Sequence, residues 1–226
     1  DAPLVRVRDV VTTHGVPVEP PWAQAFEAIT ATQRYDVRLA VHGLFQRENA
    51  ATAIAIVERL NDRLRPAREA VERGLAAARI AGRMEIFADG GITLVFDIAH
   101  NVEKAAHLSA SLREQFPDRR ISYVVAIGDT KDSPRILGQL ATSGAHAIAT
   151  RFSASGRNAV DARELAGMAR TAGMTAESIE PAAEAFGQGR RRARDGDVLV
   201  VTGSTFLVAE IRDAWLRQGA AAFGPG

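Results

Sequence analysis

An acid, a histidine and an amide stand close together where an expected strand ends: Asp97, His100 and Asn101. The apolar run 92–95 precedes them, and an amphipathic segment that begins near Val102 follows. In open α/β sheets, ligands bind in the crevice outside the carboxyl ends of the strands. The N-terminus of a helix behind that crevice favours anions. These residues therefore predict a site for a nucleotide or an acid.

Each of the three residues has a functional and a structural interpretation. A carboxylate can accept two hydrogen bonds from a vicinal diol, so Asp97 is a candidate to hold a ribose; the alternative is a helix N-cap. His100 is a candidate phosphate contact, and the alternative is a surface or packing residue. Asn101 is expected to be a helix cap rather than a ligand group.

Three more polar clusters follow expected strands: the segment 128–132, then Arg151, then the segment 202–205. In a parallel sheet all four clusters face the same edge. Lys131, in the first of these segments, supplies a compact charge suited to an anionic substrate; the alternative is a solvated charged turn. Ser204 suits an anion held by backbone N–H groups at a helix start; the alternative is a plain cap.

The elements that must position these side chains alternate between strand and helix from residue 79 onward. The expected strands are 84–87, 92–97, 121–127, 145–150 and 198–202, and the expected helices are 102–115, 133–142, 161–172, 181–194 and 205–217. This alternation predicts an α/β fold, a Rossmann-like and mainly parallel sheet with helices on both faces. We expect this domain to cover residues 79–218, followed by a tail over 219–226.

Residues 1–78 form a separate part with a different pattern. Strand-like segments are expected at 4–11 and 36–41, and helices at 47–64 and 67–73. This part is expected to be too small for a complete core of its own.

Composition excludes several classes of function. The formal net charge is +1, and the basic run 190–192 has no aromatic residues interleaved, so we expect neither nucleic acid nor an anionic membrane as partner. There are no cysteines, and the five histidines lack the spacing of a helical metal pair, so no metal site is expected. The chain contains no G-x-S-x-G, G-x-G-x-x-G or G-x-x-x-x-G-K-[ST] motif. No apolar run is long enough to span a membrane, and a cytoplasmic protein is the default expectation.

Five segments, in order, resemble the C-terminal portion of the folylpolyglutamate synthase/dihydrofolate synthase family, within the Mur ligase superfamily. The segments 43–53, 82–85, 97–101, 130–132 and 202–206 resemble its G-x-H-Q-x-x-N-A-A-x-A, P-G-R-x-E, D-G-A-H-N, D-K-D and T-G-S-x-y motifs. The resemblance spans about residues 36–212, nearly the whole chain.

The resemblance implies an ATP-dependent ligase that adds L-glutamate to a folate or dihydropteroate carboxylate through an acyl phosphate. It implies ATP-binding roles for Asn49, Arg83, Asp97 and His100, and glutamate-binding roles for Lys131 and Ser204. Residues 1–78 would be a remnant of the central ATP-binding domain, whose exposed apolar surface would favour self-association. The P-loop and the Mg²⁺ ligands would lie in a missing N-terminal part. We therefore expect no catalytic residue in this chain alone, and no activity without that part.

The chain departs from the family pattern at several positions: Phe45, Ala81, Ile98, Val102 and Thr130 replace histidine, proline, glycine, proline and aspartate. These departures keep two alternatives open. One is a non-catalytic module that binds an anion or nucleotide. The other is a Mur-type ligase with a different acceptor.

Overall fold

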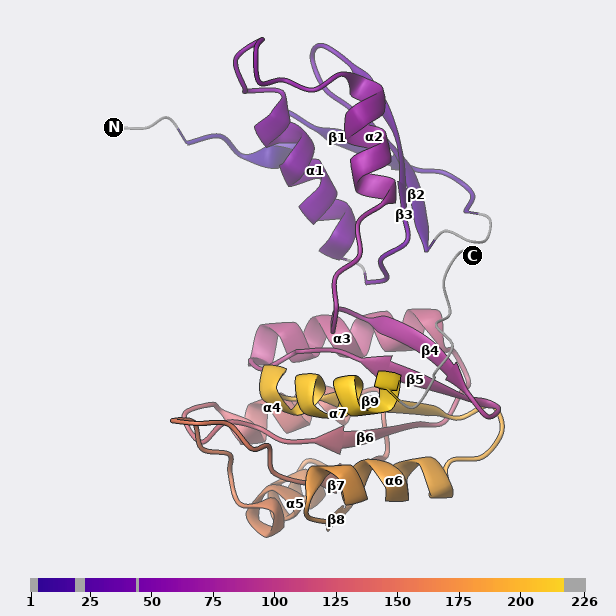
Figure 1. Cartoon of the computed structure of the whole chain (residues 1–226), viewed down its shortest axis with the longest axis vertical. Coiled ribbons are helices and arrows are strands. Elements are labelled where there is room, and N and C mark those ends of the chain that lie inside the picture. Colours follow the sequence, from indigo (N-terminus) through magenta and orange to yellow (C-terminus); the bar gives the residue numbers. More distant parts are fainter. Residues whose placement is uncertain (1–3, 19–22, 44, 218–226) are drawn as a thin grey trace. The chain divides into compact units, whose positions relative to one another are not determined.

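The computed structural model describes residues 4–18, 23–43 and 45–217, and the chain divides into two compact units (Figure 1). The first unit ends at Ile80, and the second begins at Ala81. None of the helices in the described residues has the length and apolar content that crossing a bilayer requires.

The first unit is a three-stranded antiparallel sheet with two helices. Its elements are a 3-10 turn at Val7–Asp9, strands β1 (Thr12–Gly15), β2 (Gln24–Ile29) and β3 (Arg34–Leu39), and helices α1 (Phe45–Val57) and α2 (Arg68–Ala76). Burial alternates along β3, so Tyr35, Val37 and Leu39 lie on the covered face of the sheet. They form one apolar cluster with Phe26 of β2 and Ile54 of α1.

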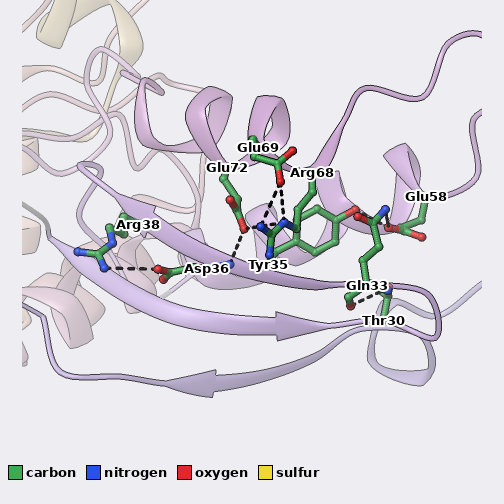
Figure 2. A network of polar contacts seen from close by, with 9 residues as sticks. All are labelled: Thr30, Gln33, Tyr35, Asp36, Arg38, Glu58, Arg68, Glu69 and Glu72. Atoms are coloured by element: carbon green, nitrogen blue, oxygen red, sulfur yellow. Dashed lines mark hydrogen bonds and ion pairs between the residues drawn. The ribbon is translucent and has the colours of Figure 1, made fainter.

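Polar contacts tie both helices of this unit to β3. The Tyr35 hydroxyl donates to Glu58, the residue after α1, and the Asp36 N–H donates to Glu72 of α2 at 2.8 Å (Figure 2). Burial and the Glu58 hydrogen bond raise the pKa of Tyr35, so its hydroxyl keeps the proton that it donates.

One expectation for this unit was wrong. The segment 4–11 is not a strand: Val7–Asp9 forms a 3-10 turn, and Leu4 is 87% exposed. No strand pairs with this segment in the described residues, so its apolar residues alone do not make it extended. The unit also has an apolar cluster of its own, because β1 and β2, neither of them expected, complete the sheet that α1 covers.

The second unit is a six-stranded sheet in the order β4-β5-β9-β6-β7-β8. Its strands are β4 (Glu85–Asp89), β5 (Ile92–Phe96), β6 (Ile121–Val125), β7 (His146–Ala149), β8 (Thr175–Ser178) and β9 (Val198–Thr202). Within this sheet β4 runs antiparallel to its neighbour β5, and the other described strand pairs are parallel. The strand β8 was not expected, because its short sequence Thr-Ala-Glu-Ser carries no apolar run.

Helices cover both faces of this sheet. They are α3 (Val102–Gln115), α4 (Ser133–Leu140), α5 (Ala162–Thr171), α6 (Ala182–Arg192) and α7 (Thr205–Arg217). Side chains of α3, α4 and α5 share one apolar cluster with Val95 of β5, whereas those of α6 and α7 share another with Leu94 and Phe96. Successive strand residues point to opposite faces, so the two clusters lie on opposite sides of the sheet. The expected α/β fold is confirmed.

Candidate functional site

The carboxyl edge of the second sheet has a topological switch point between β5 and β9. These two strands are parallel neighbours, but the chain leaves β5 for α3 on one face and β9 for α7 on the other. Such a divergence opens the crevice in which α/β sheets bind ligands. Here the two loops also touch, because the Gly203 N–H donates to the Ala99 carbonyl at 3.0 Å. The segments around Asp97 and Ser204 therefore belong to one edge.

Asp97 is buried, with 3% of its surface exposed, and both carboxylate oxygens accept hydrogen bonds from the backbone. Oδ1 accepts from the Ala99 N–H at 2.8 Å, and Oδ2 accepts from the Met84 N–H at 2.9 Å. Neither oxygen is left exposed for a ribose diol. Asp97 is not a helix N-cap either, because Asn101 caps α3 by accepting from the Lys104 N–H at 2.8 Å. That role of Asn101 is confirmed.

The segment 82–84, which precedes β4, is held by hydrogen bonds to the loop after β5 and to Glu85. The Ile98 N–H donates to the Gly82 carbonyl at 2.8 Å, and Glu85 accepts from the Gly82 N–H at 2.9 Å. Arg212 of α7 donates two parallel hydrogen bonds, of 2.6 and 2.7 Å, to the carboxylate of Glu85. Those bonds raise the pKa of the Arg212 guanidinium. Arg83 is half-buried inside this fastened segment.

Arg212 was missed by sequence reasoning. It lies 127 positions from Glu85, and nothing in the local pattern of α7 separates it from the other arginines.

His100 lies in the loop between β5 and α3 with both ring nitrogens engaged. Nδ1 lies 2.8 Å from the Ile98 carbonyl, and Nε2 lies 3.3 Å from the Lys104 ammonium. Burial lowers the pKa of His100, and the positive charges of Lys104, Lys131 and Arg83 lower it further. At neutral pH the imidazole is therefore uncharged and stands among cations.

Lys131 and Ser204 lie at the same edge but in different surroundings. Lys131 is exposed in the turn after β6, next to Asp132, which caps α4 by accepting from the Arg135 N–H. Ser204 is 5% exposed, and its Oγ accepts from the Phe206 N–H at 3.1 Å, so it caps the start of α7. Its hydroxyl proton remains available to a ligand.

Asn49 lies in the first unit, on an exposed position of α1, where its amide donates to Gln46 at 3.0 Å. The five other expected site residues all lie in the second unit. Within the described part of the chain, no group of three or more acidic or histidine side chains is placed to hold a metal ion.

The titration of Asp97 provides a test of this geometry. Burial raises the pKa of Asp97 from 3.8 to about 6, although the two backbone donors and nearby cations oppose the shift. Because the folded pKa exceeds the unfolded value, the folded chain binds more protons between about pH 4 and 6. The free energy of unfolding contributed by this group therefore falls as pH rises through that window.

Between pH 4 and 7 we expect the free energy of unfolding of the wild type to fall by up to about 3 kcal/mol relative to that of Asp97→Asn, at about 1.4 kcal/mol per pKa unit. Urea unfolding of both proteins across this range measures the difference, since the amide does not titrate. A constant gap between the two proteins would refute the raised pKa.

Comparisons with known proteins agree on one family. Residues 82–205 match the family model described as Mur ligase, glutamate ligase domain. A Haloferax volcanii protein described as a bifunctional folylpolyglutamate synthase/dihydropteroate synthase is 29% identical over 189 residues, which cover 83% of this chain and 22% of that protein. The UDP-N-acetylmuramoyl-L-alanyl-D-glutamate–2,6-diaminopimelate ligase of Corynebacterium glutamicum is 30% identical over 202 residues, which cover 84% of this chain and 38% of that ligase.

The fold is similar to that of a solved ligase structure. The folylpolyglutamate synthase of Mycobacterium tuberculosis, complexed with ADP, has a TM-score of 0.76 and 24% identity to this chain. That match covers 94% of this chain and 48% of the other. The chain thus spans less than half the length of the relatives that it matches.

Proposed function

The chain belongs to the Mur ligase family through its glutamate ligase domain, and from this premise we propose that it acts within an ATP-dependent ligase that adds L-glutamate to a folate or dihydropteroate carboxylate. The observation that carries the proposal is the gathering of Arg83, His100, Lys131 and Ser204 in one unit, at the carboxyl edge that the family match spans. Relatives with folylpolyglutamate synthase activity in their names support the choice of substrate.

The roles follow from the chemistry of each group. Lys131 and Ser204 hold the carboxylates of L-glutamate, since a mobile ammonium and a hydroxyl at a helix start both bind anions. Arg83 faces the phosphates of ATP, and Asn49 of the first unit contacts the adenine. Asp97 acts through the backbone of Met84 and Ala99 rather than by touching the nucleotide.

The other elements of the reaction lie outside these residues. The sequence has no P-loop motif, so the triphosphate and its Mg²⁺ need a partner segment, and we expect the 226-residue chain alone to release no ADP. Closure of that segment over this unit would exclude water from the acyl phosphate. The exposed Ile56 and Leu64 of the first unit, 59% and 65% accessible, offer an apolar surface for such a segment or for a second copy of the chain.

The complete gene product tests the proposal. ADP release is measured with ATP, Mg²⁺ and either folate or dihydropteroate, with L-glutamate added or omitted. Release that depends on L-glutamate supports the proposal. The Corynebacterium relative favours a second candidate, a ligase with a UDP-linked peptide acceptor, so that acceptor with diaminopimelate is a further arm. No release in any arm would leave the non-catalytic binding module as the better account.

We expect Lys131→Ala to raise the KM for L-glutamate by about 10- to 100-fold, which is what the loss of one charge-assisted hydrogen bond costs. The KM for ATP should change much less. Arg135→Ala is the matched control, since Arg135 is an exposed cation on the neighbouring first turn of α4. Equal changes in the two KM values would remove Lys131 from the glutamate site.

A further inference from the structure

Lysine is rare in this chain, and both lysines lie at the candidate site. Of the 28 lysine and arginine residues, all but two are arginine, and the two lysines are Lys104 and Lys131. Both stand at the carboxyl edge of the second sheet, close enough to His100 to act on its charge. An ammonium is a compact charge with three donors on one atom, whereas a guanidinium is a planar fork. The edge thus concentrates the one cation type that the rest of the chain avoids.

The hydrogen bonds of His100 leave it no nitrogen for a ligand. If Nδ1 carries the proton, it donates to the Ile98 carbonyl, and Nε2 accepts from Lys104; this tautomer satisfies both contacts. His100 precedes the N-cap Asn101 and Lys104 lies in the first turn of α3, so the entry of the chain into the helix brings the two side chains together. The Lys104 ammonium has three N–H donors; one donates to the imidazole, and two remain for a ligand.

The cations of this edge form no ion pair in the part of the chain that the structure describes. Within the described residues, no acid lies at ion-pair distance from Lys104, Lys131 or Arg83. Asp97 is the nearby buried acid, and both of its oxygens already accept from the backbone. Asp97 acts on Arg83 and Lys104 only through its charge, and the remaining positive potential at this edge favours a bound polyanion.

Three buried hydroxyls at the same edge have no hydrogen-bond partner in the described part of the chain. They are Ser133 Oγ at the start of α4, Thr150 Oγ1 after β7 and Thr202 Oγ1 at the end of β9, and each residue is at most 2% exposed. A buried hydroxyl without a partner is unusual, and a bound water or ligand group is one way to satisfy it.

We propose that Lys104 contacts a phosphoryl group bound at this edge and that His100 is a positioning residue, which holds the Lys104 ammonium in place. The resemblance to the family implied instead that His100 itself contacts the nucleotide. The assignment rests on the proposed function, which supplies a nucleotide polyphosphate as the anion. The low pKa of His100 supports it, because a neutral imidazole keeps the acceptor that Lys104 needs.

The low lysine count makes a direct experiment possible. The full chain labelled with ¹³C-lysine gives signals from only two side chains, which Lys104→Met and Lys131→Met assign. Titration with inorganic pyrophosphate at low salt should shift the Lys104 Cε–Hε signal. Lys104→Met should weaken pyrophosphate binding about tenfold or more, as expected for a charge-assisted contact. Arg113→Met, which removes an exposed cation farther along α3, should leave binding unchanged.

The role of His100 has its own test. His100→Ala should weaken pyrophosphate binding, and His100→Gln should restore part of it, because the Gln oxygen can accept from Lys104. Unchanged affinity in Lys104→Met, or no pyrophosphate binding by a folded chain, would overturn the assignment, since every group involved lies in the second unit.

A parallel titration with L-glutamate separates the two proposals. A response of Lys131 to L-glutamate without any response of Lys104 to pyrophosphate would leave the proposed function standing and remove Lys104 from it. The opposite pattern would keep the phosphoryl site and contradict the glutamate site.

Discussion

Gly203→Ala is expected to destabilise the second unit by about 2–5 kcal/mol. Gly203 has a φ of +95°, and a Cβ at this position would lie 2.5 Å from the Ala126 carbonyl oxygen and 2.9 Å from a Val125 methyl group. The left-handed backbone costs an L-residue about 1–2 kcal/mol. Displacing a packed neighbour adds about 1–3 kcal/mol. Urea unfolding of the full chain measures the change.

Gly196→Ala is the matched control for this substitution. Gly196 has a similar φ of +87°, but nothing lies within 4 Å of a Cβ placed there. We therefore expect it to lose only the backbone part, about 1–2 kcal/mol. The difference between the two losses of stability measures the cost of the close approach between Gly203, after β9, and Ala126, after β6. Equal losses would show that the end of β9 gives way without strain, and that Ser204 is not rigidly placed.

The second unit could be predicted from sequence because its signals are local. Apolar runs such as 198–201 alternate with amphipathic segments of helical length, and that alternation leads to parallel strands joined by crossovers. Parallel strands end at one edge, so the grouping of Asp97, Lys131 and Ser204 also followed from the pattern. The strand β8 was missed because pairing with β7, rather than its own residues, makes it extended.

The chemistry within the edge was less predictable than its position. A carboxylate after a strand looks the same in sequence whether it faces a ligand or the backbone. Asp97 takes its partners from Met84 and Ala99, and the first of these lies 13 positions away, across the turn into β4. Lys104 was passed over for a similar reason, since a lysine in a first helical turn is ordinary until its ammonium is placed against His100.

The contact between Arg212 and Glu85 should have the second large effect. We expect Arg212→Met to destabilise the second unit by about 2–3 kcal/mol, because two charge-assisted hydrogen bonds are lost and Glu85 keeps only the Gly82 N–H. Both side chains are less than a quarter exposed, so solvent compensates poorly. Arg212→Lys should recover only part of the loss, since an ammonium cannot form the paired bonds.

Exposure, rather than distance, decides the size of this effect, and Arg191 provides the control. Its ion pair with Glu184 has the same 2.6 Å separation as the shorter Arg212 bond, but the two side chains are 58% and 50% exposed. Arg191→Met should therefore cost less than about 1 kcal/mol in the same urea measurement. If the two variants lose equal stability, the Glu85 contact is an ordinary surface pair. In that case α7 does not fix the segment that carries Arg83, and its position relative to the phosphate site must be set by the hydrogen bonds that Gly82 and Met84 form with Ile98 and Asp97.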